Sequence, residues 1–147
     1  MSLIATIQKE LTAAMKERDA ERRDALRLIL SSLQSAEKEL QRPLHEDEEL
    51  QVLQRERKRR LESIEAFEAG GRPEQAAKEE GELEVLEEFM PEPLSEDDLE
   101  RIVDDAIAEN KATSMRDMGR VMADVMPQIA GRADGSAVSQ LLREKLA

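Results

Sequence analysis

Residues 131–136 read Gly-Arg-Ala-Asp-Gly-Ser, which combines flexible backbone, a guanidinium and a hydroxyl as an anion site would. The N–H groups that open a following helix can hold a phosphate, and Arg132 would lie beside it. The stretch is not a nucleotide-binding P-loop, because that motif has four residues between its glycines and a lysine after the second. It is not an EF-hand, since Asp134 is its single carboxylate. Two interpretations stay open: a phosphate contact and a plain corner between two helices.

The side chains that commonly act in catalysis are few or unspecific. His45 is the only histidine, and His-Glu-Asp-Glu-Glu lacks the second histidine of a zinc-protease helix, so we expect it at a helix N-terminus. The hydroxyl residues mostly stand where helix caps are expected. Residues 79–100 hold eleven acidic side chains and no basic one, which is typical of a solvated face. We therefore assign no catalytic residue, no metal site and no cofactor, and lean against an enzyme.

The run Arg-Glu-Arg-Lys-Arg-Arg at 55–60 is a candidate anion patch. Its side chains can also form ion pairs on one helix, such as Glu56 with Arg60, and point to water. Arg57 is the exception because it falls on the apolar stripe of that helix, so we expect a buried stem and a carboxylate partner. This structural interpretation is favoured over an RNA role for the run.

The composition indicates helices in water. Of 147 residues, 38% are charged and 1% are aromatic, with no cysteine, tryptophan or tyrosine. Such a composition is typical of solvated amphipathic helices, and the lack of cysteine fits a reducing compartment. No stretch approaches the roughly 18 apolar residues of a membrane span. We expect a soluble, cytoplasmic protein without a membrane partner.

The net charge of −12 argues against indiscriminate nucleic-acid binding, and no DNA partner is expected. The charge is unevenly spread, however. Residues 1–110 hold 16 basic and 30 acidic side chains, whereas residues 111–147 hold 6 basic and 4 acidic ones. The tail is therefore the part that could face an anion, through Lys111, Arg116, Arg120, Arg132, Arg143 and Lys145.

Apolar residues recur with helical spacing and no segment alternates with a period of two, so we predict an all-α protein with seven helices. The apolar stripes include Met15, Leu40 and Leu61 in the first three. Gly70-Gly71 is expected to end the third helix and Pro127 the sixth. The expected starts are Ser2, Asp19, residues 45–49, Pro73, Ser95, Ser114 and Ser136.

The segment Met90-Pro-Glu-Pro-Leu-Ser95 has two prolines within three residues and cannot continue a helix. We place the domain boundary there. The expected architecture is an amino-terminal bundle of about four helices over 1–92 and a small three-helix carboxyl-terminal domain over 93–147.

The segments 117–127 and 131–136 resemble the signature of the GatB/YqeY family, and residues 46–53 and 86–95 agree with it. The resemblance extends over essentially the whole chain and is strongest to stand-alone YqeY-type members. It implies two helical domains. It also implies kinship with the tail of the GatB subunit of aspartyl/glutamyl-tRNA amidotransferase, which contacts the body of tRNA.

Carried to this chain, the resemblance places Val125 and Met126 in the core and turns Gly131-Arg132 towards RNA. The chain has Ala123 where the amidotransferase subunits usually carry glycine, and no lysine at 128–130, so its loop holds fewer cations. Relatives often carry the label carbon–nitrogen ligase with glutamine as amido donor. That label describes the large complex, and this chain has no matching nucleophile or carboxylate-activating site.

Our leading hypothesis is a non-catalytic accessory module that binds tRNA, or an amidotransferase or aminoacyl-tRNA complex, through residues 116–136. The predicted RNA-binding residues are Arg116, Arg120, Gly131, Arg132, Gly135 and Ser136. The alternative is a protein-interaction adaptor that docks through the acidic residues 79–100 or through a Met-rich face. That face would consist of Met118, Met122 and Met126, for which core packing is the favoured interpretation.

Overall fold

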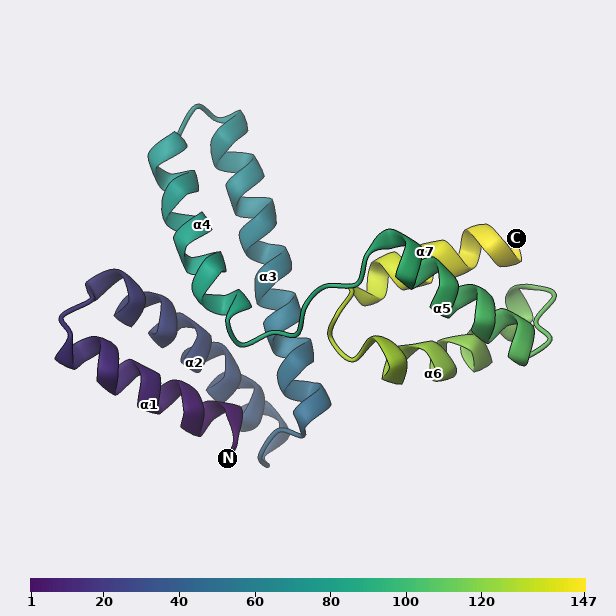
Figure 1. Cartoon of the computed structure of the whole chain (residues 1–147), viewed down its shortest axis with the longest axis horizontal. Helices are drawn as coiled ribbons and strands as arrows, with labels where there is room; N and C mark the ends of the chain where they lie inside the picture. The colour runs from purple at the N-terminus through teal and green to yellow at the C-terminus, as the bar shows by residue number, and fades with distance from the viewer. The chain divides into compact units, whose positions relative to one another are not determined.

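The computed structural model describes residues 1–147 and contains seven α-helices, one 3₁₀ turn and no strand. The predicted all-α fold class is therefore confirmed. The chain divides into two compact units, unit 1 (Met1–Met90) and unit 2 (Pro91–Ala147), joined by an irregular segment (Figure 1).

Unit 1 holds four helices: α1 (Leu3–Lys16), α2 (Ala20–Leu40), α3 (Glu46–Ala69) and α4 (Pro73–Glu87). Unit 2 holds the other three: α5 (Glu96–Glu109), α6 (Met118–Ile129) and α7 (Gly135–Leu146), with the 3₁₀ turn η1 (Met115–Asp117) directly before α6.

Local signals in the sequence set most helix ends. The predicted caps Ser2, Asp19 and Ser95 each accept a hydrogen bond from the backbone N–H three residues later, which satisfies a donor that the helix cannot. α4 begins at Pro73 and α3 ends before Gly70, as predicted. These starts and stops are encoded locally and need no tertiary contact.

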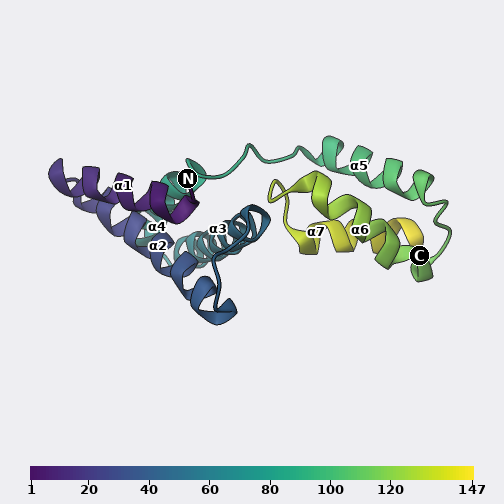
Figure 2. The ribbon, with the colours of Figure 1, turned by 90° about the horizontal axis from the view of Figure 1, so that it is seen from below.

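Unit 1 is built from two antiparallel helix pairs, α1 with α2 and α3 with α4 (Figures 1 and 2). α2 also packs against α3 and α4, so it joins the two pairs. Burying an aliphatic side chain of this kind contributes about 1.5–3 kcal/mol. The buried core consists of Ile7, Ala14, Leu26, Ile29, Leu33, Val52, Leu53 and Leu86.

Three predicted stripe residues lie outside the core, since Met15, Leu40 and Leu61 are all exposed. Met15 and Leu40 lie in the last turns of α1 and α2, beyond the helices that cover the rest of those stripes. Leu61 is displaced because the inward positions of α3 recur at 52, 56, 60 and 64. Two of these positions carry charge, so apolar spacing alone gave the wrong phase.

An ion pair is buried between α3 and its neighbours. Arg60 and Glu56 are 7% and 8% exposed, and Arg60 Nη1 donates to Glu56 Oε2 at 2.9 Å. Glu56 Oε1 also accepts from Ser32 on α2 at 2.9 Å, and Arg60 Nε lies 3.7 Å from a carboxylate oxygen of Glu82 on α4. The prediction that this pair points to water is wrong, because α2 and α4 cover both sides of α3.

Two further charged groups belong to this part of unit 1. Arg57 is half-buried and its Nε lies 3.5 Å from Glu87 on α4, which confirms the buried stem and carboxylate partner expected for it. Burial raises the pKa of Glu82, and the negative charge of Glu79 adds to that effect, while Arg60 opposes it. The α3–α4 contact is thus as much ionic as apolar.

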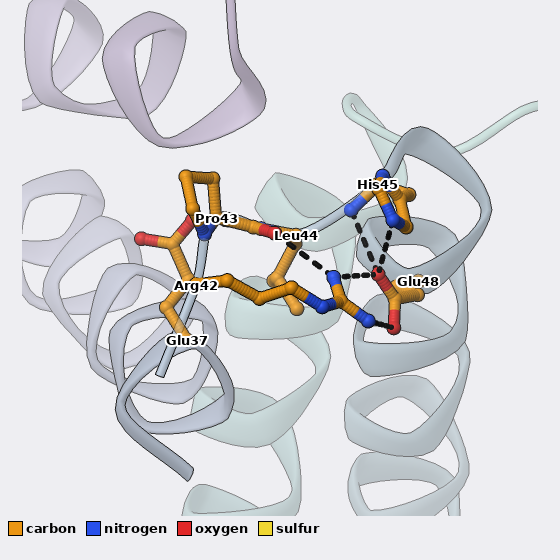
Figure 3. Close-up of polar contacts among 6 residues, drawn as sticks. All are labelled: Glu37, Arg42, Pro43, Leu44, His45 and Glu48. Atoms are coloured by element: carbon orange, nitrogen blue, oxygen red, sulfur yellow. Dashed lines mark hydrogen bonds and ion pairs between the residues drawn. The ribbon is translucent and has the colours of Figure 1, made fainter. Parts of the chain in front are cut away.

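The corner between α2 and α3 is fixed by polar contacts to Glu48 (Figure 3). Its two oxygens accept from Arg42 Nη1 and Nη2 at 2.7 and 2.9 Å, and Oε1 also accepts from the His45 N–H at 2.9 Å. Leu44 N–H donates to Glu37 at 3.0 Å. His45 stands at the N-terminus of α3, as predicted.

Unit 2 is a three-helix arrangement in which α5, α6 and α7 each contact the other two. No aromatic residue lies in its sequence, so the core consists of small and medium aliphatic side chains. The buried residues are Val103, Ala106, Val121, Val125, Ile129, Val138, Leu142 and Leu146. Neither unit contains a helix with the length and apolar character needed to cross a membrane.

Arg60→Ala is expected to destabilise the chain by about 3 kcal/mol or more, because it leaves the buried Glu56 without its closest cation. Arg59→Ala is the matched control, since Arg59 also contacts Glu56 but is 68% exposed, and it should change the stability by less than about 0.5 kcal/mol. Urea unfolding followed by circular dichroism measures both. Equal effects of the two substitutions would contradict a structural role for the buried pair.

The bonds from Arg42 and from the His45 N–H lower the pKa of Glu48 from 4.5 to about 2. Because the folded-state pKa is depressed, ionised Glu48 stabilises the fold above about pH 4.5, and this contribution is lost as the pH falls towards 2. Carboxyl-carbon NMR should give the low midpoint, and Arg42→Ala should raise it. A Glu48 midpoint near 4.5 in the unsubstituted chain would refute this.

Candidate functional site

The predicted site begins at η1, where Asp117 organises the chain ahead of α6. Its carboxylate accepts from the Thr113 N–H at 2.9 Å and from Arg120 Nη2 at 2.5 Å, and these two bonds, the backbone one first, lower the pKa of Asp117. Ser114 was expected to cap the sixth helix. It instead accepts from the Arg116 N–H and caps η1, and α6 starts three residues later.

Arg116 and Arg120 both lie on the surface. The side chain of Arg120 is 61% exposed although one nitrogen is bound to Asp117, and Arg116 is exposed without an ion pair. The Arg120 bond costs little of the local positive charge, because an exposed ion pair in water is weak and readily exchanged. Both guanidinium groups are accessible to a ligand.

The outward face of α6 is lined by small side chains. Gly119, Ala123 and Pro127 recur every four residues and are all exposed, as is Ala130 after them. A Cβ added at Gly119 would meet nothing within 4 Å, so packing does not require glycine there. A mid-helix glycine costs roughly 0.5–1 kcal/mol relative to alanine. The face lets a partner approach the helix backbone closely.

The inward side of α6 carries the methionines. Met118, Met122 and Met126 are half-buried and pack against the core of unit 2, beside the buried Val121 and Val125. The favoured interpretation of the methionine spacing as core packing is therefore confirmed. A docking surface made of these methionines is not available in this structure.

The end of α6 differs from the prediction. Pro127 lies inside α6, which continues to Ile129. Its position in the last turn removes only one backbone N–H from the helix, so the helix is not broken. The turn is made instead by Ala130 and Gly131, which have φ values of 37° and 77°. Gly131 thus has the left-handed conformation that was predicted for it.

Arg132 ties the loop to the start of unit 2. Its Nε donates to the Glu92 carbonyl at 3.0 Å, and its own carbonyl accepts from the Leu94 N–H at 3.0 Å. The neighbouring Ala133 packs against the core. Arg132 therefore has a structural role that the sequence did not predict, because its partners lie far earlier in the chain.

Asp134, not Ser136, is the N-cap of α7. Its carboxylate accepts from the Ser136 N–H at 3.2 Å, and Ser136 lies inside the helix. The Ser136 cap prediction is wrong because two residues with capping side chains compete and the earlier one lies at the turn. Gly135 opens the helix without a positive φ, so it is not needed for a tight turn. A carboxylate already occupies the amides at which a phosphate was considered.

The predicted residues form two groups at the two ends of α6. Arg116 and Arg120 lie at its start, and residues 131–136 follow its end, about 18 Å away for a helix of 12 residues. They outline an elongated face. The small residues Gly119, Ala123 and Pro127 between them were missed, although their spacing opposite the methionine stripe could have identified them.

The charges of unit 2 are separated between helices. The first turn of α5 is acidic at Glu96, Asp97 and Asp98. Glu100 and Asp104 of α5 bind Lys145 at 2.9 and 2.8 Å, and the bond to Asp104, followed by that to Glu100, raises the pKa of Lys145. Lys145 is thereby neutralised, and the cations that remain accessible belong mainly to the segment around α6.

The remaining chemistry of the chain is sparse. No group of three His, Asp or Glu side chains is placed so that it could hold a metal ion. The acidic stretch 79–100 is divided between the two units, with residues 79–90 in one and 91–100 in the other, so it is not one helical face.

Comparison with known proteins gives one family and several relatives. The family described as Yqey-like protein matches residues 4–146. A glutamyl-tRNA(Gln) amidotransferase subunit of Thermococcus gammatolerans is 40% identical over 72 residues, which cover 46% of this chain but only 12% of that protein. The sequence resemblance implied kinship with an amidotransferase subunit, and this match is with such a subunit.

Two eukaryotic relatives match over more of their own length. An uncharacterized protein of Schizosaccharomyces pombe is 33% identical over 94 residues, covering 64% of this chain and 76% of that protein. Altered inheritance of mitochondria protein 41, mitochondrial, of Pyrenophora tritici-repentis is 29% identical over 146 residues, or 97% of this chain and 80% of that protein. The cytoplasmic location expected for this chain stays a prediction. Since the family match runs through nearly every residue of both units, the chain belongs to the Yqey-like protein family.

Proposed function

We propose that this chain is an accessory module that contacts tRNA, free or held in an amidotransferase or aminoacyl-tRNA complex, through unit 2. The outward face of α6 and the loop after it would touch the phosphate backbone. The observation that carries the proposal is the pairing of exposed Arg116 and Arg120 with a face of small residues on the same helix. The similarity to an amidotransferase subunit named for glutamyl-tRNA supports the choice of RNA.

The chemistry of this face suits the backbone of folded RNA. Arginine binds phosphate through charge-assisted hydrogen bonds, and the missing side-chain bulk at Gly119 and Ala123 lets the sugar–phosphate chain approach. The phenylalanines Phe67 and Phe89 both lie in unit 1, so unit 2 has no aromatic platform on which unpaired bases could stack. The contact would therefore recognise the shape of a helical RNA segment.

The acidic charge of α5 fits the same proposal. A polyanion is repelled from the first turn of α5 and attracted to the segment around α6, so the charge separation orients the unit. We further propose that units 1 and 2 are two domains and that the second carries the RNA contact. Within it, Arg116 and Arg120 would bind phosphate, Gly131, Gly135 and Ser136 would lie against the backbone, and Arg132 would both fix the loop and contact RNA.

Replacing Arg116 and Arg120 together by glutamine should weaken tRNA binding and make it less salt-dependent. Each lost phosphate contact lowers the slope of log affinity against log salt by about 1, so the pair should lower it by about 2. Gel shift or filter binding of the whole chain with tRNA at several salt concentrations measures this. Arg23→Gln with Arg101→Gln removes the same charge elsewhere and is the control. If the two double variants bind alike, the assignment of the site is wrong.

Gly119→Leu should separate folding from binding. In an exposed helix, leucine is more favourable than glycine, so the free energy of unfolding should rise by about 0.5–1 kcal/mol while tRNA affinity falls because bulk blocks the face. Gly81→Leu in α4 is the matched control, since a Cβ there also meets nothing within 4 Å. It should stabilise without changing affinity. Thermal melts and the same binding assay decide, and unchanged affinity for Gly119→Leu would argue against close backbone approach.

A further inference from the structure

The basic run 55–60 is sorted by the structure into two sets of side chains. Arg57 and Arg60 turn towards carboxylates of α3 and α4, as described above, and serve the fold. Arg55 and Arg59 are exposed. They line a groove of about 240 Å³ between α2 and α3 in unit 1. The function proposed for unit 2 does not use this groove.

The groove is rich in hydrogen-bond donors. On the α2 side it is lined by Ser31, Ser32 and Ser35, and on the α3 side by the guanidinium groups of Arg55 and Arg59. Ser32 is already engaged, because its hydroxyl lies 2.9 Å from Glu56 and 3.2 Å from the Leu28 carbonyl. Ser31, Ser35 and Arg55 make no hydrogen bond or ion pair within the protein through their side chains. Their donors are left for a ligand that accepts hydrogen bonds.

Glu56 forms the floor of the groove without cancelling its charge. Its Oε1 is bound by Ser32 and, at 3.2 Å, by Arg59, and its Oε2 is bound by the buried Arg60. One full positive charge from Arg60 therefore balances Glu56, and Arg59 is held in place by it. Glu39 is the other carboxylate at the groove, against the two cations Arg55 and Arg59.

We propose that the groove between α2 and α3 binds a phosphate group through Arg55, Arg59, Ser31 and Ser35. Two guanidinium groups supply charge and paired N–H donors, and two hydroxyls on the facing helix supply further donors. A phosphate has enough acceptor oxygens to use donors from both walls at once, which a chloride ion does not. The phosphate could belong to a small phosphorylated molecule or to an RNA backbone, and the chemistry of recognition is the same.

The test is a titration of the whole ¹⁵N-labelled chain with inorganic phosphate at constant ionic strength, with chloride as the balancing anion. Saturable shifts are expected for the amide signals of Ser31 and Ser35 and for the Nε signals of Arg55 and Arg59. Arg55→Gln with Arg59→Gln should weaken binding about tenfold or more. Arg27→Gln with Lys58→Gln takes the same charge from other positions on the two helices and should leave it unchanged.

A second substitution tests the sign of the field and avoids damage to the fold. Glu39→Gln should strengthen phosphate binding several-fold, because it removes the one carboxylate of the groove that no buried arginine balances. Shifts that grow linearly without saturation, or that persist in the Arg55/Arg59 double variant, would overturn the proposal. So would a Glu39→Gln variant that binds phosphate more weakly.

Adding tRNA to the same sample identifies the source of the phosphate. If tRNA moves the groove signals and inorganic phosphate reverses the shift, the groove binds an RNA phosphate. If phosphate binds and tRNA leaves the groove signals unmoved, the groove serves a small phosphorylated ligand. The proposal does not depend on the RNA contact of unit 2, since the variants at Arg116 and Arg120 test that contact separately.

Discussion

The buried pair Glu56–Arg60 is the interaction on which the arrangement of unit 1 depends. A guanidinium can be buried at low cost only when its charge and its donors are matched, and a carboxylate on the same helix together with another on α4 does so here. This requirement fixes which side of α3 faces its neighbours. Leu61 is consequently left on the surface, and Arg55 and Arg59 are turned to the groove beside α2.

The same division between satisfied and accessible charge explains unit 2. Lys145 binds two carboxylates of α5, and Arg132 donates to a backbone carbonyl, so both serve the fold. Arg116 and Arg120 stay at the surface beside the small residues of α6. A core without aromatic residues needs a tightly packed helix, and the methionines on the inner side of α6 fill it. The outer side is then free of packing demands and available for a partner.

Much of the fold follows from local sequence. Helical period, prolines, paired glycines and short polar caps predicted all seven helices, because each of these signals acts within one turn of the chain. The errors came where neighbours distant in sequence decide. The burial of Glu56 and Arg60 depends on α2 and α4 covering α3, and the role of Arg132 depends on Glu92. Asp134 replaced Ser136 as the cap, a choice that the turn at Ala130-Gly131 makes.

The candidate site was predictable in part for the same reason. Arg116 and Arg120 were identified by type and charge, and the structure leaves both exposed. The small face between the two ends of α6 emerges only when the helix is placed with its methionines inward. The phosphate site considered at the start of α7 lost its support, since the carboxylate of Asp134 already accepts a hydrogen bond there.

The most direct test of the central claim is chemical-shift mapping of the whole chain with tRNA. The account predicts that the amide signals of Arg116, Gly119, Arg120, Ala123 and Gly131 shift or broaden as tRNA is added, while those of Asp97 and Arg101 on α5 stay in place. Shifts confined to α5, or no shift in unit 2 at low salt, would contradict it.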